Sequence, residues 1–365
     1  MQALTRPPFG RLAGKISVHT GEGEFFETVA SGKLLRAIAE RSTKPVSLWL
    51  LGGTLGSGKT WTLSWLVREG PALLSNTTRE RWALSGFYFL PRGPPDRAFF
   101  EAFFAASSDI RTSILEGLRS RPVVPVSRGP YANVVRSALS SSKIWGVLCG
   151  QSSNFPKKRG RPALPSWLNP VTRMGVFIEF LRTMKDVGFS RLAILVDEFE
   201  ATVATLGTKG VATLSHFLRQ LHDEMESTSG IPHTQVVLAG TREVINTLYP
   251  PPSEGPVVRV TPPSVLVQAL RDRLAPTHYL GEFTKKDALA LADLRIGVAR
   301  ATRTSQRYIP YEEQAIVLAY ENSVGNVRNF VTSLESMYDE ALSVDLELIT
   351  AEFARKVLRK RGLLR

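Results

Sequence analysis

Eight consecutive residues near the start of the chain have the pattern of a phosphate-binding loop. Residues 53–60 read Gly-Thr-Leu-Gly-Ser-Gly-Lys-Thr and fit G-x-x-x-x-G-K-[ST], the Walker A pattern. Glycines let backbone N–H groups close around phosphate oxygens, and a helix that begins at the loop adds the positive end of its dipole. An apolar run at 46–51 precedes the loop and a helix-like run at 61–67 follows it, which is the context that this motif requires.

The residue types in this loop imply particular roles in binding ATP and Mg²⁺. Lys59 is expected to reach the β- and γ-phosphates, and the hydroxyl of Thr60 is expected to ligate Mg²⁺. The alternative is a glycine-rich turn between a strand and a helix with no ligand. The backbone of the remaining loop residues would cradle the phosphates: Gly53, Gly56, Ser57 and Gly58.

A pair of acidic residues follows a second apolar run and has the pattern of a Walker B motif. Residues 192–196 are continuously apolar, as expected of a parallel strand that is buried on both faces, and Asp197 and Glu198 come directly after them. Asp197 would hold Mg²⁺ through its hydration shell, and Glu198 would polarise the attacking water. By itself the pair could also cap a helix, but together with residues 53–60 it favours ATP hydrolysis. Glu200 receives no role.

Composition restricts the class of protein further. The chain has 365 residues, of which 43% are hydrophobic, and this suffices for one large α/β domain and a smaller one. Cys149 is the single cysteine, which excludes internal disulfides and cysteine-rich metal sites and favours a cytoplasmic protein. The first residues lack the apolar core of a signal peptide, and no run approaches the length of a membrane span, so no membrane partner is expected.

Positive charge is concentrated in one part of the sequence. The formal net charge is +13, and no acidic residue occurs between Glu116 and Glu179, a stretch that holds ten basic residues. A tract of this kind favours DNA as the partner, although a solvated basic face or a flexible loop is the alternative. Within it, residues 159–162 (Arg-Gly-Arg-Pro) resemble the core of an AT-hook, which lies in the narrow minor groove of DNA. The candidate nucleic-acid residues are Lys157, Lys158, Arg159 and Arg161.

Alternation of strands and helices predicts a parallel sheet with helices on both faces. We expect strands at 46–51, 86–90, 192–196, 235–239 and 278–280. Helices are expected at 25–41, 97–118, 131–145, 174–184, 211–225 and 265–274, and the pattern from 285 onward is helical throughout. The fold class is therefore α/β, with a parallel-sheet P-loop domain followed by a small all-helical lid domain.

These elements suggest three segments along the chain. Residues 1–45 form an N-terminal arm and helix, and residues 46–282 form the P-loop α/β domain. Residues 283–365 form the helical lid with a basic C-terminal tail. A basic insertion around 117–178 interrupts the α/β domain. Because Thr60 and Asp197 are too far apart for a single strand–helix unit, we expect an extra strand and helices between them.

At this point the sequence resembles the AAA+ ATPases, in which a P-loop α/β domain precedes a helical lid. Residues 235–242 are similar to a sensor 1 strand, in which Thr241 would help to position water near the γ-phosphate. Residues 325–328 (Gly-Asn-Val-Arg) resemble the sensor 2 motif that opens a lid helix, so Arg328 would contact the γ-phosphate. A surface arginine is the alternative reading of Arg328, but a guanidinium is well suited to phosphate recognition.

The same resemblance implies an arginine finger, which acts on the ATP of a neighbouring subunit. Arg271 and Arg273 lie just before the last expected strand, where members of the family carry the finger, and the choice between them stays open. Arg273 could equally pair with Asp272 or Glu282. The resemblance thus implies that the protein assembles with itself in a ring or filament.

Within the AAA+ proteins, the order of motifs resembles the initiators and the TnsC- and TniB-like transposition ATPases. Residues 239–244 look like the sensor 1 turn of the latter, and residues 348–352 are similar to the lid ending of both. Initiators usually carry a winged-helix domain after the lid, and we expect none in this protein. This difference from the initiators favours an ATPase with no separate DNA-binding domain. DNA would then contact the inner surface of the oligomer or the basic insertion.

The resulting expectation is an ATP-dependent, DNA-binding, oligomeric regulator in transposition or another DNA-transaction system, which assembles on DNA with ATP and is released by hydrolysis. The alternative is a protein-directed switch or remodeller in signalling or defence, with unidentified protein partners and no dependence on DNA. A non-catalytic ATP-binding scaffold is disfavoured because Asp197 and Glu198 are both present.

Overall fold

The structure is a computed structural model, and every structural statement below concerns the residues that it describes. These are 27–89, 93–120, 129–151, 169–241, 270–299 and 308–362. They divide into two compact units, which we call the loop–lid unit and the sheet unit. The loop–lid unit contains the described residues up to Leu34, Gly53–Trp65 and those from Leu280 onward; the sheet unit contains Leu35–Gly52 and Leu66–Tyr279.

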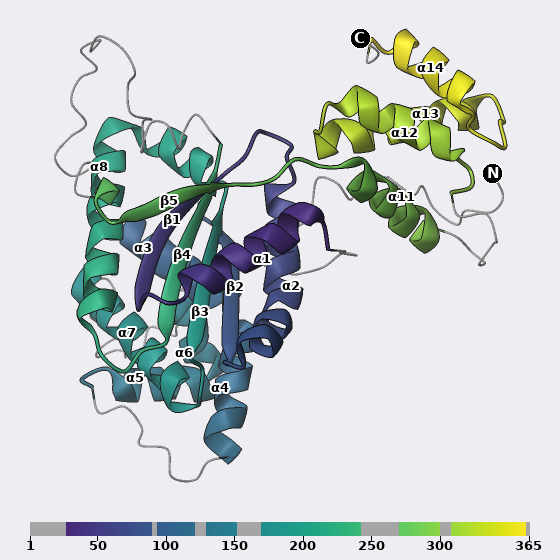
Figure 1. Cartoon of the computed structure of the whole chain (residues 1–365). Helices are drawn as coiled ribbons and strands as arrows, with labels where there is room; N and C mark the ends of the chain where they lie inside the picture. Colours follow the sequence, from purple (N-terminus) through teal and green to yellow (C-terminus); the bar gives the residue numbers. More distant parts are fainter. Residues whose placement is uncertain are drawn as a thin grey trace. The chain divides into compact units, whose positions relative to one another are not determined.

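The sheet unit is built on five strands that pair in parallel throughout, in the order β2-β3-β4-β1-β5 (Figure 1). This arrangement confirms the predicted α/β fold with a parallel sheet. The strands are β1 (Val46–Gly52), β2 (Trp82–Tyr88), β3 (Arg191–Asp197), β4 (His233–Gly240) and β5 (Leu274–Tyr279).

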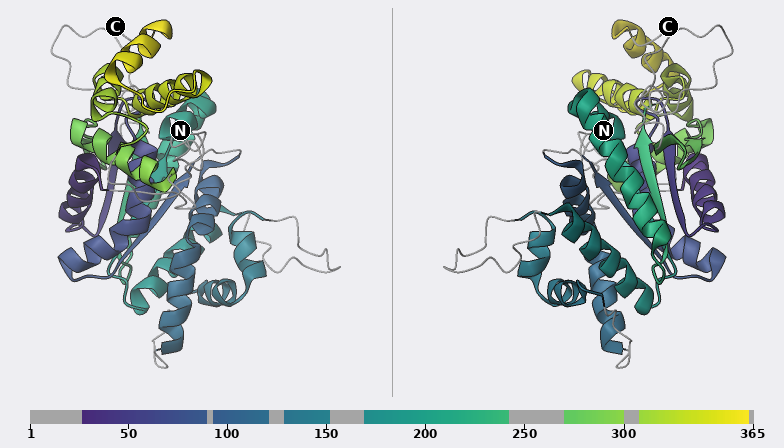
Figure 2. Two further views of the ribbon diagram at one scale, coloured as in Figure 1. Left: turned by 90° about the vertical axis from the view of Figure 1, so that its right-hand side faces the viewer. Right: turned by 90° about the vertical axis from the view of Figure 1, so that its left-hand side faces the viewer.

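Helices bury both faces of this sheet, which explains the near-continuous apolar runs in its strands. Alternate residues of β1 such as Leu48 and Leu50 share a core with α3 (Pro95–Ala106), α7 (Pro170–Asp186) and α8 (Phe199–Ser227). On the opposite face, Gln235 of β4 donates from Nε2 to the Ile38 carbonyl of α1 (Val29–Arg41) at 2.7 Å. Figure 2 shows the sheet between α2 (Lys59–Thr78) on one side and α8 on the other.

A cluster of aromatic side chains fills the core under α3 and α7. Phe103 packs edge-on against Phe177 with ring centroids 5.1 Å apart, and Phe104 packs similarly against Trp145 at 5.5 Å. Trp145 comes from α6 (Ser142–Leu148), which follows α5 (Ala132–Ser140), so the cluster ties these insertion helices to the sheet. Edge-to-face packing of this kind adds to the stabilisation that burial of the rings supplies.

Strand register places three functional positions at one edge of the sheet. Gly52 at the end of β1 pairs with Gly240 at the end of β4, and Val196 of β3 pairs with Leu238 of β4. Asp197, the last residue of β3, therefore ends at the same carboxyl edge as Gly52 and Gly240. In open parallel sheets this is the edge where ligands bind.

The loop–lid unit contains four helices after β5: α11 (Lys285–Ala299), α12 (Glu313–Ser323), α13 (Val327–Ser343) and α14 (Ala351–Lys360). Their buried apolar residues form a second core, and this arrangement confirms the predicted all-helical lid. Thr350 caps the last helix, because its Oγ1 accepts the Phe353 amide proton at 3.2 Å. The predicted segment boundaries around 46 and 283 remain predictions.

Some elements differ from the sequence expectations because tertiary contacts outweigh local patterns. β2 begins at Trp82 rather than at 86, since Ser85 is polar yet fully buried and bonds to the Ser107 hydroxyl at 3.2 Å. The single helix expected at 97–118 is two helices, α3 and α4 (Ser108–Ser120), which divide at Ser107. The helix expected at 131–145 divides at Ser141, which is extended and caps α6.

Two further expectations concern the segments around β4. α8 begins at Phe199 and not at 211, because the glycine-containing stretch that precedes 211 joins the same helix. The helix expected at 265–274 is wrong at its end, because Leu274 is the first residue of β5 and pairs with Leu48. The strand expected at 278–280 is the end of that same β5. Residues 265–269 lie outside the described residues.

Among the described residues, no helix combines the length and the apolar character needed to cross a membrane.

Candidate functional site

The phosphate-loop pattern adopts a strand–loop–helix conformation. The loop follows directly after Gly52, the end of β1, and α2 begins at Lys59, so Lys59 and Thr60 are the first two helical residues. Gly56 and Gly58 have φ angles of +78° and +87°, which favour glycine. A helix amino terminus with such a loop presents backbone N–H groups to an anion.

Lys59 is folded over its own loop. Its side chain is buried, and Nζ donates to the carbonyl oxygens of Gly53 at 3.0 Å and Thr54 at 3.1 Å. An ammonium group has three donors, so these bonds leave one for a ligand. The basic group is thereby held beside the loop by backbone oxygens.

The loop also contains a polar atom and a close approach that suit a phosphate ligand. The Ser57 hydroxyl oxygen is buried and has no hydrogen-bond partner among the described residues. A Cβ atom on Gly53 would lie 2.6 Å from this oxygen, so the Ser57 side chain packs closely against the first glycine of the loop. A buried hydroxyl without a partner is costly, and a phosphate oxygen would satisfy it. Together with the Thr60 hydroxyl, the donors present fit a nucleotide with its magnesium ion.

Helix α13 contacts the loop at its amino terminus. Asn326 precedes the helix, and its Nδ2 donates to the Leu55 carbonyl at 2.8 Å. The Val327 amide donates to the Gly56 carbonyl at 3.1 Å. The sensor 2 candidate Arg328 lies in the first turn of this helix with its side chain exposed.

An apolar hollow lies beside the loop within the loop–lid unit. Its walls come from α2, from the start of α1 and from the lid. Trp61, two positions after Lys59, forms part of the wall, and the Arg295 guanidinium lies over its ring at 5.8 Å. The other walls include Thr28, Ala30, Phe283, Leu291 and Val327.

A buried carboxylate joins two walls of this hollow. Asp287 of α11 accepts the Val29 amide proton of α1 at Oδ1 (3.1 Å), and its Oδ2 accepts from the amide and hydroxyl of Thr284 at 3.0 and 2.7 Å. The Thr284 hydroxyl in turn accepts the Asp287 amide proton at 3.2 Å, which forms a capping box. Asp287 therefore holds the first residue of α1 against the lid.

The Walker B candidates occupy the carboxyl edge of the sheet unit. Asp197 is buried at the end of β3, and its Oδ1 accepts the Glu198 amide proton at 2.9 Å. Glu198 is exposed and has a left-handed backbone, with φ of +52°, before α8 begins at Phe199. Such a conformation is unfavourable for a non-glycine residue and concentrates at functional sites.

The sensor 1 candidate ends the neighbouring strand at the same edge. Thr241 is half-buried and follows Gly240, the last residue of β4. A Cβ atom on Gly240 would lie 3.4 Å from Oε2 of Glu200. This Glu200 oxygen is buried and lacks a hydrogen-bond partner within the part of the chain that the structure describes. Register thus brings Asp197 and Thr241 to one edge, with Glu200 beside Gly240.

The two finger candidates lie at the opposite edge. Arg271 and Arg273 precede β5, whose first residue pairs with Leu48 and whose last residue pairs with Gly52. The length of β5 is about 20 Å at the usual rise per residue. Asp272 and Glu282 were the suggested partners of Arg273, and its Nε and Nη2 donate to Asp223 of α8, a partner that the sequence did not suggest.

The four candidate DNA residues, Lys157, Lys158, Arg159 and Arg161, lie outside the described residues. Within the described chain, exposed basic residues gather on α14 and directly after it. Lys360 pairs with Glu340 at 2.5 Å, and Arg361 donates to the Ser336 hydroxyl at 3.4 Å. The other basic residues of α14 are Arg355, Lys356 and Arg359.

Sequence reasoning passed over several residues that contact the loop or line the hollow. Asn326 stood inside the quoted sensor 2 motif without a role, although asparagine before a helix is a recognisable cap. Asp287 ends the run Thr-Lys-Lys-Asp, a capping-box pattern that the sequence contains at 284–287. Trp61 had no local signal for lining a hollow, because its neighbours there come from distant segments.

Comparison with known proteins indicates the fold alone. No protein-family model matches the sequence, and no curated protein matches it significantly. Among solved structures, the Aeropyrum pernix ORC2 protein in its ADPNP–ADP complexes has a TM-score of 0.51 and 13% identity, covering 93% of this chain and 70% of that one. Its ADP form has a TM-score of 0.49 at 11% identity, with the same coverage. Drosophila ORC bound to DNA has a TM-score of 0.45 at 11% identity, covering 93% and 63%.

Proposed function

We propose that the protein is a P-loop ATPase that binds ATP with Mg²⁺ and assembles with itself on DNA. The observation that carries the nucleotide part is the loop itself, with left-handed Gly56 and Gly58, a helix that starts at Lys59 and a buried, unpartnered Ser57 hydroxyl among the described residues. The ORC2 structure of similar fold holds ADPNP and ADP, which supports this proposal.

Each part of the nucleotide has a candidate set of residues. Lys59 and the loop amides would bind the β- and γ-phosphates, and the apolar hollow beside Trp61 would receive the base. Thr60 and Asp197 would hold Mg²⁺, which supplies charge neutralisation on the phosphates. The buried hydrogen bond from Val29 to Asp287 would hold the start of α1 against the lid beside the base.

The remaining candidates would act on the attacking water and the γ-phosphate. Glu198 would accept a proton from the water, and Thr241 would orient that water from the end of β4. Arg328 would contact the γ-phosphate from the lid. One of Arg271 and Arg273 would act on the nucleotide of a neighbouring subunit, since both lie at the edge opposite Asp197. Positioned charges of this kind carry most of the catalysis in phosphoryl transfer.

The test of nucleotide binding is calorimetric titration of ATP and ADP into the wild type and Lys59→Ala. Removing a charge-assisted hydrogen bond to phosphate should weaken binding by about 100-fold. Lys33→Ala is the matched control, because Lys33 is an exposed lysine of α1 in the same unit. Equal ATP affinity of the wild type and Lys59→Ala would contradict the proposal.

The DNA part of the proposal is supported by charge. The sequence has a net charge of +13 and an acid-free tract, and α14 adds exposed basic residues in the lid. Binding to phosphates releases counterions, so the logarithm of the affinity should fall linearly with the logarithm of the salt concentration. The basic tract and α14 are two candidate surfaces, and both would contribute to this slope.

The test compares salt slopes of duplex DNA binding for three sets of substitutions. Alanine at Lys157, Lys158, Arg159 and Arg161, or at Arg355, Lys356 and Arg359, should reduce the slope by about 0.9 for each DNA phosphate that the variant no longer neutralises. Alanine at Lys285 and Lys286, exposed on α11, is the control pair. Slopes identical to wild type in both sets would argue against these surfaces.

The finer proposal is a regulator of the kind that acts in transposition or replication initiation. It rests on the resemblance of residues 239–244 and 348–352 to those ATPases. We expect ATP and DNA together to produce rings or filaments and hydrolysis to dissolve them. Mass measurement by light scattering, with ATP, ADP and the Glu198→Gln variant, tests this, and assembly size independent of nucleotide would count against it.

A protein-directed switch is the second candidate, and one observation favours it. The end of α13 and the following turn expose three large apolar side chains, with Leu342, Val344 and Leu348 at 47%, 59% and 39% exposure. Exposed apolar groups of this kind often mark protein contacts. ATP hydrolysis that does not respond to DNA would favour this candidate.

A further inference from the structure

Asn326 makes two different hydrogen bonds with the two ends of its side-chain amide. Its Oδ1 accepts the Asn329 amide proton at 3.1 Å, which caps α13. Its Nδ2 donates to the Leu55 carbonyl of the phosphate loop at 2.8 Å. The amide orientation is consistent, because the oxygen faces a donor and the nitrogen faces an acceptor.

A second bond joins the same helix to the next peptide of the loop. The Val327 amide donates to the Gly56 carbonyl at 3.1 Å. The first N–H groups of a helix have no partner within it, so a loop carbonyl here takes the place of a cap. A Cβ atom on Gly56 would lie 2.5 Å from Oδ1 of Asn326, so the contact leaves no room for a side chain.

These two bonds define the orientation of two loop peptides. In a planar trans peptide the carbonyl and the following N–H point in opposite directions. Holding the Leu55 and Gly56 carbonyls toward α13 therefore turns the N–H groups of Gly56 and Ser57 away from it, and the Ser57 amide donates to the Thr54 carbonyl within the loop at 3.2 Å. Such loop amides are the groups that bind phosphate in this class of loop.

The turn that delivers Asn326 to the loop is conformationally unfavourable. Val324 and Gly325 both have left-handed backbones, with φ of +50° and +73°. Valine is β-branched and strongly disfavours this region, and its side chain is 76% exposed, so little packing compensates. Unfavourable backbones of this kind persist where the surrounding structure holds them, often at functional sites.

We propose that Asn326 is a positioning residue that couples the conformation of the phosphate loop to helix α13. Through this coupling, a nucleotide that orders the loop would also restrict the position of α13, the helix that carries Arg328. Conversely, the capped helix would hold the loop amides in place before the nucleotide binds. The inference rests on the proposed nucleotide binding at this loop. It adds a second role to a residue whose sequence context indicates only a helix cap.

The test separates the cap from the loop contact. Asn326→Asp keeps a good cap but places an acceptor against the Leu55 carbonyl, and Asn326→Ala removes both bonds. Thr350→Ala is the matched control, because it removes the cap of α14 in the same unit. The readouts are ATP affinity by calorimetry and amide hydrogen exchange of residues 53–58 and 326–330 without nucleotide.

We expect Asn326→Asp and Asn326→Ala to bind ATP about tenfold more weakly and to exchange the Val327 amide faster, with neither effect in Thr350→Ala. If the wild type binds ATP and Asn326→Asp binds it equally well, the coupling is wrong while the proposed function stands. If the wild type binds no ATP, the proposed function fails. Hydrogen exchange then still decides: unchanged protection of Val327 in Asn326→Asp overturns the link, and weaker protection supports it.

A steady-state comparison identifies the role of Arg328 in this coupling. If Asn326 acts by placing Arg328, combining Asn326→Ala with Arg328→Ala should lower kcat no further than Arg328→Ala does, although KM rises. Additive reductions in kcat would show that Asn326 does not act through Arg328.

Discussion

Arg273 and Asp223 form a bidentate ion pair that joins the approach to β5 with α8. Nε donates to Oδ1 at 2.5 Å and Nη2 donates to Oδ2 at 3.1 Å. Hydrogen bonding to Arg273 lowers the pKa of Asp223, and the same bond raises the pKa of Arg273. Arg273 could act as an arginine finger on the nucleotide of a neighbouring subunit only if its hydrogen bonds to Asp223 were broken.

We expect the pair to contribute modestly to stability, because both side chains are partly exposed, at 31% and 42%. Asp223→Asn should lower the free energy of unfolding by about 0.5 kcal/mol, and a double-mutant cycle with Arg273→Gln should give a coupling energy of similar size. Urea unfolding of the four proteins measures it. Asp272→Asn, on an exposed neighbour, is the control, and a coupling energy near zero would refute the prediction.

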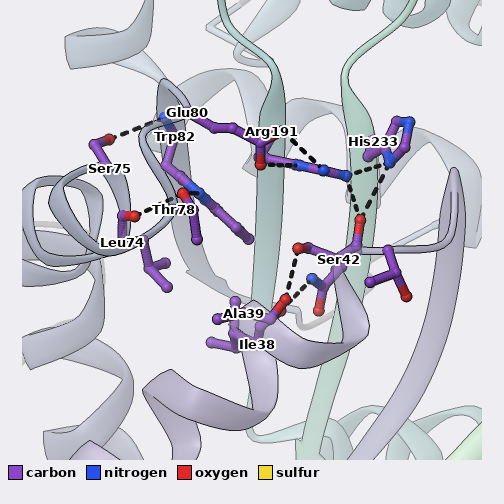
Figure 3. Close-up of polar contacts among 12 residues, drawn as sticks. Ile38, Ala39, Ser42, Leu74, Ser75, Thr78, Glu80, Trp82, Arg191 and His233 are labelled. Carbon is purple, nitrogen blue, oxygen red and sulfur yellow. Dashed lines mark hydrogen bonds and ion pairs between the residues drawn. The ribbon is translucent and has the colours of Figure 1, made fainter.

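The amino edge of the sheet contains a second network, which is centred on Arg191 (Figure 3). Nε and Nη2 of Arg191 donate to the Glu80 carboxylate at 2.6 and 2.9 Å. Nη1 also contacts the Ser42 carbonyl and Nδ1 of His233, so one guanidinium joins the starts of β3 and β4 to the turns before β1 and β2. The hydrogen bond from Arg191 lowers the pKa of Glu80.

This network predicts a pH-dependent contribution to stability. Because the folded-state pKa of Glu80 is lowered, its stabilisation is present above the ordinary glutamate pKa of about 4.3 and is lost as the pH falls through the folded-state value. Glu80→Gln should therefore lower the free energy of unfolding by about 1 kcal/mol at pH 7 and by much less in acid. Denaturant titrations at both pH values measure this, with Glu69→Gln in the exposed Arg68–Glu69 pair as control.

Trp61 should report nucleotide binding by its fluorescence. It lines the hollow beside the loop and lies two positions after Lys59, so a bound base would change the surroundings of its ring. We expect ATP to alter the tryptophan emission of the wild type and of Trp82→Phe, but not of Trp61→Phe. Trp82 suits the control because it is buried in the sheet unit, where its Nε1 donates to Thr78. An equal response in Trp61→Phe would place the base elsewhere.

We expect Val324 to lower the stability of the fold, because its left-handed backbone is unfavourable for valine. Asparagine tolerates the left-handed region better than valine, so Val324→Asn should raise the free energy of unfolding by about 0.5–1 kcal/mol. Val171 offers a control of similar exposure, at 66%, because it lies in the first turn of α7 with helical backbone. Val171→Asn should give no gain. Thermal and urea unfolding measure both, and a decrease of stability in Val324→Asn would contradict the argument.

Local sequence was sufficient wherever one continuous segment carries the signal. The phosphate loop and the buried strands around 46–51, 192–196 and 235–239 depend on residues that are close in sequence. Local sequence was insufficient where a residue far away in the sequence determines the bounds of a helix or strand. β2 includes Ser85 because Ser107 satisfies its hydroxyl, and α3 ends where Ser107 turns, although no glycine or proline marks the position.

The α/β class, the helical lid and the residue types of the loop could be predicted because periodicity and motif spacing are local properties. Which distant groups meet depends on how the complete elements pack. Asn326 reaches Leu55 across 271 positions, and Asp287 reaches Val29 across 258. Arg273 pairs with Asp223 rather than with its neighbour Asp272. A hydrogen bond needs an approach of about 3 Å in a defined direction, and only the packing of complete helices and strands brings such separated groups to that distance.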